Sequence, residues 1–307
     1  MKDTLVVVNP ASAGGRTGRR WPAIEACLRA AGLAFDVAMT SAPGDAAELA
    51  GRGAREGRRL VVAAGGDGTI NEVANGLLAA GAQPASTRLG VMPTGTGGDF
   101  RRSLGLPPEP DRAAAVLSAG RCRRIDAGRV TCARPGGGSA VRHFVNIASA
   151  GIAGEVVESV RGRRRFVSGE LTFLLASVRT LLRWRNRAVR VVIDGAVREL
   201  VVQQVVVANG QFFGGGMWVA PRARPDDGLL DVVIAGDLGL RETMRALAQV
   251  REGRHLDGGS PKISHALARR VEVSSPEYVR VEADGERPGV LPAVFEVVPD
   301  ALEVVCP

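Results

Sequence analysis

The sequence predicts an α/β region followed by a β-rich region, and two patterns support this division. Over residues 1–125, short apolar runs alternate with stretches of helical periodicity, as in parallel sheets covered by helices on both faces. Beyond Arg123, β-branched stretches are separated by Gly, Pro and Asp turns, which is typical of an antiparallel β-sandwich. A length of 307 residues with 45% hydrophobic content suffices for two domains with separate cores.

The first region alternates strands and helices in order along the chain. Apolar runs predict strands at residues 5–8, 35–39, 60–64 and 89–92, and helical periodicity predicts helices near 18–31 and 45–56 and after Thr69. Strands joined in this way lie parallel, and the loops that follow them meet at one edge of the sheet. We therefore expect a Rossmann-like domain with its binding site at that edge.

The second region contains mostly strands. They are predicted at residues 125–130, 143–148, 189–193, 201–208, 229–234, 269–273 and 278–283, with helical inserts near 169–182 and 240–250. A last strand at 301–305 could return to the first sheet. We accordingly assign the first domain to 1–125, with 299–307 as a candidate addition, and the β-sandwich domain to 126–298.

The most informative loop follows the strand at 60–64 and reads Gly-Gly-Asp-Gly-Thr. Its glycines are expected to adopt backbone conformations that are closed to other residues; they are Gly65, Gly66 and Gly68. Thr69 is placed to cap the helix that follows. The free N–H groups and the positive dipole end of such a helix suit a phosphate.

One residue of this loop, Asp67, does not fit a site built for phosphates alone. A carboxylate repels phosphates unless Mg²⁺ or a reacting hydroxyl lies between them. Two more glycine-rich loops, 9–15 and 93–100, follow other predicted strands. The convergence of three such loops indicates a nucleotide triphosphate site with an acid placed for metal or proton chemistry.

Six motifs occur in order along the chain: Asn9-Pro10 and residues 65–72, 93–100, 146–151, 220–231 and 283–286. This set resembles the diacylglycerol kinase catalytic-domain family of bacterial lipid kinases. That family is related to sphingosine kinases and, more distantly, to NAD kinases and phosphofructokinases. The resemblance runs almost end to end and implies an ATP- and Mg²⁺-dependent kinase with its active site in the cleft between the two domains.

The resemblance implies that ATP binds the first domain through Asn9, Thr40, Gly65, Gly66, Asp67, Gly68, Thr69, Ile70, Asn71 and Thr96. The residues themselves agree for the two neighbouring loops, because hydroxyls and backbone N–H groups there can hold successive phosphates. Taken alone, Thr40 is typical of an ordinary strand end. Asn9 is as typical of a turn as of a nucleotide contact.

Phosphoryl transfer to a hydroxyl needs positioning, charge neutralisation by Mg²⁺ and a carboxylate that accepts the hydroxyl proton. The resemblance implies a carboxylate set around the metal, formed by Asp67, Asp99, Asp126 and Asp284, with Glu286 as the general base. A turn between Asp284 and Glu286 would let one carboxylate face the metal and the other the substrate. Without the resemblance, the same three residues are typical of a surface β-turn.

A second, structural Mg²⁺ is implied at residues 224–229. Its ligands would be the side chain of Asp227 and the backbone carbonyls of Arg224 and Leu229, and oxygen ligands from one tight loop suit this ion. Two positions depart from the family pattern. Pro225 stiffens the loop, and Gly98 stands where relatives often have asparagine.

The implied acceptor is a lipid hydroxyl, with diacylglycerol or a related lipid alcohol as the first choice. Residues 161–190 contain nine arginines and one acid, and these arginines flank an apolar helix pattern at 171–182. Such a helix could rest on an anionic membrane surface or pack in the core, and the sequence leaves both open. A homodimer is equally open.

Composition limits the other functions. The net charge of +8 favours anionic partners, yet a single tyrosine and sparse aromatics argue against a nucleic-acid binder. Four scattered cysteines indicate neither a zinc site nor a disulfide framework. A soluble-metabolite kinase of the NAD-kinase type is the alternative enzyme. Without a signal peptide or a long apolar run, we expect a cytoplasmic protein, with the inner membrane face as a candidate peripheral location.

Overall fold

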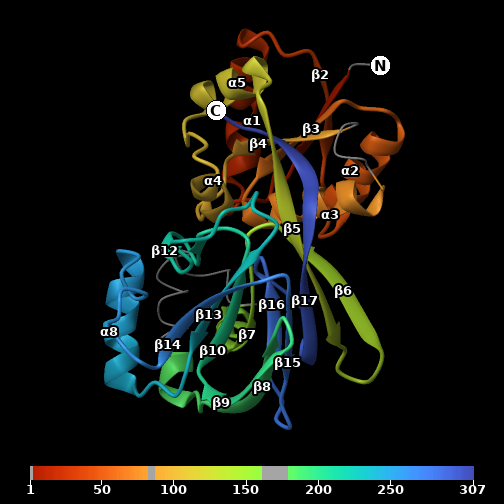
Figure 1. Cartoon of the computed structure of the whole chain (residues 1–307). Helices are drawn as coiled ribbons and strands as arrows, with labels where there is room; N and C mark the ends of the chain where they lie inside the picture. The colour runs from red at the N-terminus through yellow and green to blue at the C-terminus, as the bar shows by residue number, and fades with distance from the viewer. Residues whose placement is uncertain (1–2, 82–86, 161–178) are drawn as a thin grey trace.

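The computed structural model describes residues 3–81, 87–160 and 179–307 as two units joined by long strands (Figure 1). Within these residues, one continuous sheet of 15 strands passes through both units. The predicted class is confirmed, since parallel strands covered by helices are followed by an antiparallel β-sandwich.

The first unit contains four parallel strands in the order β4-β3-β1-β2. They are β1 (Thr4–Val8), β2 (Phe35–Met39), β3 (Leu60–Gly65) and β4 (Arg88–Pro93). One face packs on α1 (Arg16–Ala30) and α5 (Pro110–Ala119). The other packs on α2 (Asp45–Arg55), α3 (Asp67–Ala79) and α4 (Asp99–Ser103). Strands β1 and β3 are covered on both faces, which explains why they are continuous apolar runs.

Two elements of this unit were not predicted, α4 and α5. Both follow β4, where glycine, proline and arginine obscure the helical pattern. Residues Ala113, Ala114 and Leu117 of α5 pack against Trp21, Ile24 and Leu28 of α1 in one apolar cluster. Helix α4 is only five residues long, and it buries Phe100 in the opposite cluster.

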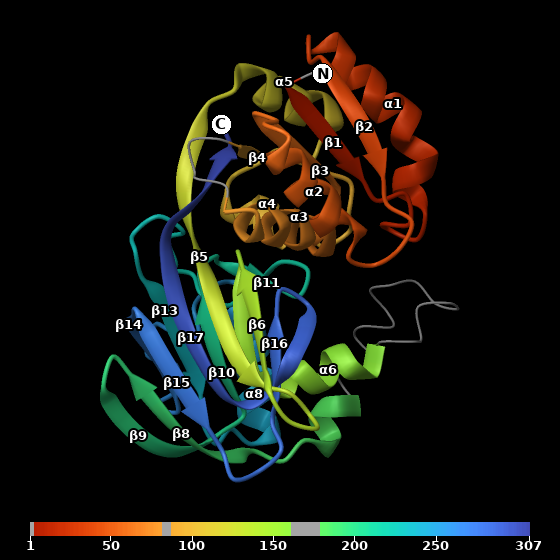
Figure 2. The same cartoon turned by 90° about the vertical axis from the view of Figure 1, so that its right-hand side faces the viewer.

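The second unit is built almost wholly from antiparallel strands around one large apolar core. They are β5 (Cys122–Ala133), β6 (Ser139–Phe144), β7 (Ile147–Gly151), β8 (Arg187–Ile193), β9 (Ala196–Val202), β10 (Gln204–Ala208), β13 (Leu230–Ala235), β14 (Ile263–Ala268), β15 (Arg270–Ser274) and β16 (Arg280–Ala283). A small hairpin joins β11 (Phe212–Phe213) and β12 (Met217–Trp218). Two helices, α6 (Ile152–Val160) and α8 (Leu240–Arg251), lie outside the strands (Figures 1 and 2).

Two predicted strands of this unit were wrong because each is two strands. The segment 143–148 divides between β6 and β7, and the segment 201–208 divides between β9 and β10 at Gln203. The side-chain amide of Gln203 donates to Thr243 Oγ1 of α8 at 2.8 Å, so this break is fixed by a buried hydrogen bond. The predicted helix at 169–182 and the arginines before it fall mostly outside the described residues.

One strand, β17 (Glu286–Val305), connects the two units (Figure 2). It pairs antiparallel with β16 at its start and with β5 along most of its length. Near its end, Val304 pairs with Leu89 of β4 in parallel. The last strand, whose return to the first sheet the sequence left open, therefore reaches that sheet, and it begins 15 residues earlier than the sequence pattern suggests.

Gly128 of β5 provides a test of this junction. It lies opposite Phe144, and a Cβ added at Gly128 would fall 1.9 Å from the ring of this fully buried side chain. We expect Gly128→Ala to lower the free energy of unfolding by about 2 kcal/mol, because a filled core tolerates little extra volume. Urea unfolding followed by circular dichroism measures the change.

Phe144→Leu supplies the control for this prediction. In the Gly128→Ala background, Phe144→Leu should lower the free energy of unfolding by less than it does in the original chain, because the smaller side chain relieves the clash. Additive losses, or a Gly128→Ala variant as stable as the original chain, would show that the ring does not constrain this position.

Candidate functional site

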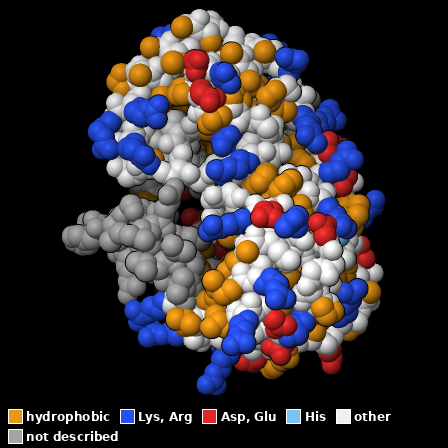
Figure 3. All heavy atoms as spheres, turned by 90° about the vertical axis from the view of Figure 1, so that its left-hand side faces the viewer, with side chains coloured by type: hydrophobic (Ala, Val, Ile, Leu, Met, Phe, Trp, Pro, Cys, Tyr) orange, Lys and Arg blue, Asp and Glu red, His pale blue; other side chains and the backbone are white. Residues whose placement is uncertain are grey.

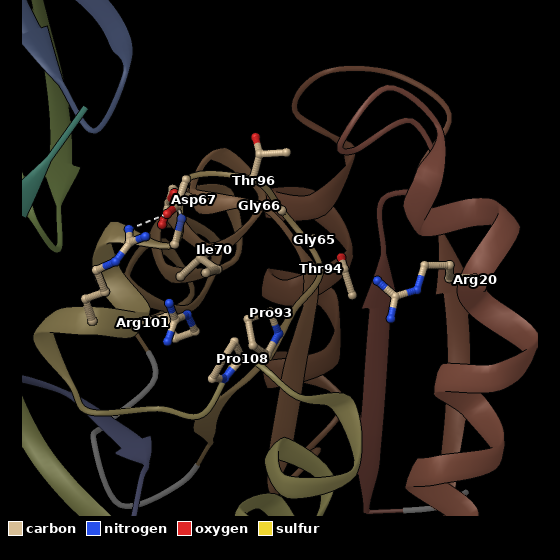
Figure 4. Close-up of a pocket in the computed structure, with 14 residues that line it drawn as sticks. Arg20, Gly65, Gly66, Asp67, Ile70, Pro93, Thr94, Thr96, Arg101 and Pro108 are labelled. Carbon is tan, nitrogen blue, oxygen red and sulfur yellow. Dashed lines mark hydrogen bonds between the residues drawn. The ribbon is translucent and has the colours of Figure 1, made fainter. Parts of the chain in front are cut away.

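The glycine-rich loops after β3 and β4 enclose a cavity of about 230 Å³. Figure 4 shows Arg20 of α1 and Arg101 of α4 on opposite sides of these loops. The full lining is Arg20, Gly65, Gly66, Asp67, Ile70, Pro93, Thr94, Gly95, Thr96, Gly97, Gly98, Arg101, Arg102 and Pro108. Backbone N–H groups and guanidinium groups are the donors that bind phosphate oxygens in proteins, so this cavity suits a polyphosphate.

The glycines of the first loop serve a different purpose from the one predicted. None of Gly65, Gly66 and Gly68 has a positive φ, so the expected special conformation is wrong. Close approach is the reason at one of them. A Cβ on Gly65 would lie 2.3 Å from Thr69 Oγ1, whereas a Cβ on Gly66 would meet no neighbour nearer than 3.4 Å. The glycine that the contact between the two loops requires is Gly95, because a Cβ on Gly95 would come within 2.4 Å of the Gly66 Cα.

The helix cap was also predicted at the wrong residue. Helix α3 begins at Asp67 with Gly66 as its N-cap, which places Thr69 inside the first turn. Thr69 is buried, and its hydroxyl accepts a hydrogen bond from Asn9 Nδ2 at 3.0 Å. Asn9 therefore connects the loop after β1 to the start of α3.

Of the predicted nucleotide residues, the structure brings Gly65, Gly66, Asp67, Ile70 and Thr96 together around the cavity. The remaining five, Asn9, Thr40, Gly68, Thr69 and Asn71, do not line it. Thr40 follows β2 at the same sheet edge, and its N–H donates to the Val8 carbonyl at 2.9 Å. The site roles of all ten residues stay predictions.

Asp67 holds the second glycine loop. Its carboxylate accepts N–H bonds from Gly98 at 2.8 Å and from Phe100 at 3.2 Å, at the N-terminus of α4. Asp99, the first residue of that helix, accepts from Arg102 at 3.2 Å and from Gly215 N–H at 2.8 Å. Burial raises the pKa of Asp99, and the nearby charge of Asp67 adds to the effect. The two carboxylates thus link the start of α3, helix α4 and the β11–β12 hairpin.

Asp284 lies in the turn between β16 and β17. With Gly285 it forms a two-residue turn in which both φ angles are positive, 47° and 84°, as Asp-Gly pairs adopt in tight hairpins. Its carboxylate accepts from Asn71 Nδ2 at 2.7 Å. Three backbone N–H groups of the β6–β7 turn also donate to it, those of Val145, Asn146 and Ile147. Burial raises the pKa of Asp284 to about 6 despite these donors.

Asn71 therefore connects the units instead of lining the cavity. Besides its bond to Asp284, its amide donates to the His143 carbonyl at 3.2 Å, and its oxygen accepts from Arg142 at 2.7 Å. Because Asn71 lies one turn after Asp67 on α3, this contact brings the Asp284 turn close to the helix that starts at the cavity. Glu286 follows at the start of β17 and is exposed.

Asp126 lies elsewhere, under the loop 224–229. Its buried carboxylate accepts N–H bonds from Gly228 at 2.7 Å and from Asp300 at 2.8 Å. Asp227 is exposed, and one of its oxygens accepts the Leu229 N–H at 3.1 Å. Within the described residues, no three Asp, Glu, His or Cys side chains form a group that could hold a metal ion. Any Mg²⁺ at the cavity would therefore take further ligands from outside this set, such as phosphate oxygens.

Two segments of the sequence match known family descriptions. Residues 3–130 match the diacylglycerol kinase catalytic domain, and residues 146–306 match the YegS C-terminal NAD kinase beta sandwich-like domain. The diacylglycerol kinase of Bacillus subtilis is 31% identical over all of this chain and 97% of its own length. This chain belongs to the diacylglycerol kinase family.

Further comparisons agree with this family. The diacylglycerol kinase of Staphylococcus carnosus is 28% identical over all of this chain and 95% of its own. A crystal structure of a diacylglycerol kinase from Bacillus anthracis superimposes with a TM-score of 0.73 at 23% identity, over 99% of this chain and 96% of that one. Yeast NADH kinase shares the fold, with a TM-score of 0.55 at 11% identity over 99% and 83% of the two chains.

Several residues in and around this cavity were not predicted from the sequence. Arg20, Arg101 and Arg102 are among them, although each follows a glycine-rich loop by a few residues. Glu282 was also missed. It is fully buried and accepts hydrogen bonds from Gly285 N–H at 2.6 Å and Ser149 Oγ at 2.9 Å.

The buried Glu282 carboxyl predicts a pH dependence of stability. Burial, aided by the charges of Asp284 and Glu286, raises its pKa from 4.5 to about 8. The folded protein thus holds this proton to a higher pH than the unfolded chain. The stability that it contributes is present below about pH 4.5 and is lost as the pH rises through about 8.

Urea unfolding between pH 5 and pH 9, with a chelator present, measures this dependence. Glu282→Gln should flatten the curve between pH 6 and pH 8, because an amide can accept the Gly285 N–H and donate to Ser149 without titrating. Exposed Glu199→Gln is the control and should keep the original slope. The same slope in both variants would mean that another group titrates.

Proposed function

We propose that the protein is an ATP- and Mg²⁺-dependent lipid kinase that phosphorylates a hydroxyl of diacylglycerol or a related lipid alcohol. Membership of the diacylglycerol kinase family supports the class of acceptor. The observation that carries the proposal is the cavity formed by two glycine loops and three arginines, with an Asp-Gly-Glu turn attached to the helix beside it. Residues 1–125 with 299–307 would bind the nucleotide, and residues 126–298 the lipid.

The nucleotide phosphates would lie on the loops 65–69 and 93–98. Gly66 and Gly95 pack closely where the two loops meet, and Arg20, Arg101 and Arg102 supply positive charge around the cavity. Asp67 and Asp99 offer the hard oxygen ligands that Mg²⁺ prefers, and Mg²⁺ is commonly held by one or two carboxylates together with substrate phosphates. When bound, the ion would neutralise charge on the transferred phosphoryl group.

Glu286 would act as the general base. Its position two residues after Asp284 places it on a turn that four hydrogen bonds to Asp284 hold in place. The lipid hydroxyl gives its proton to the Glu286 carboxylate as its oxygen forms a bond to the γ-phosphorus. The bond from that phosphorus to the bridging oxygen breaks, and ADP leaves.

Replacing the proposed base provides one test. Glu286→Gln should lower kcat by a factor on the order of 10² to 10⁴, since the amide cannot accept the proton. ADP affinity, measured by calorimetry, should change little because the residue is outside the phosphate cavity. Glu199→Gln, an exposed change on β9, is the matched control and should retain full activity. Full turnover by Glu286→Gln would remove the base from the mechanism.

The acceptor is tested separately. Purified protein with labelled ATP should phosphorylate dispersed diacylglycerol or another lipid alcohol, and a chelator should stop the reaction until Mg²⁺ is restored. NAD is the essential competitor, because yeast NADH kinase shares the fold. Transfer to NAD, with none to a panel of diacylglycerols and sphingoid bases, would replace the lipid proposal with the soluble-metabolite alternative.

A further inference from the structure

Helix α8 leaves a line of large apolar side chains uncovered. Leu240, Met244 and Leu247 are 52%, 56% and 40% exposed, and their spacing places them on one side of the helix. Another side holds the helix to the sheet through Thr243, whose buried hydroxyl accepts from Gln203 at 2.8 Å. Figure 1 shows α8 at the outer edge of the second unit. The helix is anchored by one side and open on the other.

Basic residues border this apolar line. Arg241 and Arg245 each follow one of its members, and Arg251 lies at the C-terminal end of the helix. In the described part of the chain, none of these three forms an ion pair within 4.0 Å. The acid within the helix, Glu242, forms an ion pair with Lys262 at 2.7 Å, and the charge of Arg245 acts on it from farther away. The open side of α8 therefore combines apolar side chains with arginines that form no direct ion pair among the described residues.

A second segment extends this surface. Leu182 is 66% exposed, and its neighbours Arg183 and Arg185 are also exposed. Asn186 donates to Asp237 Oδ1 at 2.7 Å and to the Leu238 carbonyl at 3.1 Å, two residues before α8 begins. This contact brings the segment beside the N-terminal end of α8. Figure 3, from the side on which α8 lies in Figure 1, shows hydrophobic and basic side chains intermixed on the lower unit.

We propose that this α8 surface, formed by Leu240, Met244, Leu247, Arg241, Arg245 and Arg251 with Leu182 beside it, docks on an anionic lipid bilayer. An amphipathic helix lies in the interface plane with its apolar side chains among the acyl chains and its basic residues among anionic headgroups. Each basic residue near such a surface adds attraction on the order of 1 kcal/mol. The positive charge of the surface favours an anionic bilayer over a second copy of the chain as its partner, because two copies of this surface would repel each other.

The surface is also connected to the candidate site. Gly253, just after α8, lies so close to Trp218 of β12 that an added Cβ would fall 2.7 Å from the indole ring. Trp218 stacks on Phe212 across the β11–β12 hairpin, and Gly215 within this hairpin donates to Asp99. A bilayer held at α8 would therefore lie one hairpin away from the second glycine loop. The purpose of such docking, which is to bring the enzyme to a lipid substrate, rests on the proposed function, whereas the docking itself does not.

Vesicle sedimentation tests the proposal without any kinase substrate. Vesicles of phosphatidylglycerol and phosphatidylcholine are compared with vesicles of phosphatidylcholine alone, at low and high salt. The intact chain should bind the anionic vesicles, and binding should weaken with salt. The triple variant Leu240→Ser, Met244→Ser, Leu247→Ser should bind about tenfold more weakly or worse, because it loses the apolar anchor.

Two further variants make the test specific. Val197→Ser with Val201→Ser removes two large apolar side chains of β9 that are 52% and 43% exposed, and it should bind as the intact chain does. Arg241→Gln with Arg245→Gln should weaken binding to anionic vesicles while keeping the apolar line. All variants should unfold at the same urea concentration as the intact chain, which excludes misfolding as the cause.

The opposing outcomes are distinct. Vesicle binding that is unchanged in the triple and the double arginine variants would overturn the proposal. A dimer in light scattering that the triple variant dissociates would also overturn it, because a second copy would then cover the surface. Kinase activity on a short-chain diacylglycerol dissolved as monomer is measured in parallel. The triple variant should keep this kinase activity, because it lacks only the docking surface, whereas Glu286→Gln should lose it. The two results therefore test the docking surface and the proposed function separately.

Discussion

The carboxylate of Asp284 lies where the two units meet, and such a group is costly to bury unless donors surround it. Four N–H groups do so, one from α3 and three from the β6–β7 turn. The donors come from segments far apart in the chain, so the carboxylate fixes α3, the β6–β7 turn and the β16–β17 hairpin at one point. The position of Glu286 and the distance between the units both depend on this arrangement.

Much of the fold could be predicted because its signals are local. The continuous apolar runs of β1 and β3 predict a parallel sheet, which the structure confirms, and the glycine-rich loops after β3 and β4 line a cavity at the edge where these strands end. Short helices and strand breaks could not be predicted, because they depend on distant partners. Gln203 interrupts an apolar stretch only because Thr243 lies 40 residues away, ready to accept its amide proton.

The candidate site shows the same limit at the level of single residues. The glycines at 65 and 66 were interpreted as a need for special backbone conformations, but the structure requires glycine at 65 because of its contact with Thr69, and the contact between the two loops requires glycine at 95. Because side chains alternate along β16, Glu282 lies on the face of the strand that points away from the sandwich core, and that face would be expected to meet solvent. Helix α6 packs on this face of β16 instead, with Gly154 against Arg280. No local pattern in the sequence predicts that this helix covers the strand.

The length of β17 has a consequence for how the chain acquires its fold during synthesis. The first sheet contains β4 at its edge until Val304 pairs with Leu89, and β5 has no long partner until the same strand arrives. The first unit therefore gains its outer strand only after the β-sandwich has been made, although its own residues emerge first. The last strand of the chain completes the edge of one unit and the pairing of β5 in the other, so the two units become joined late in synthesis.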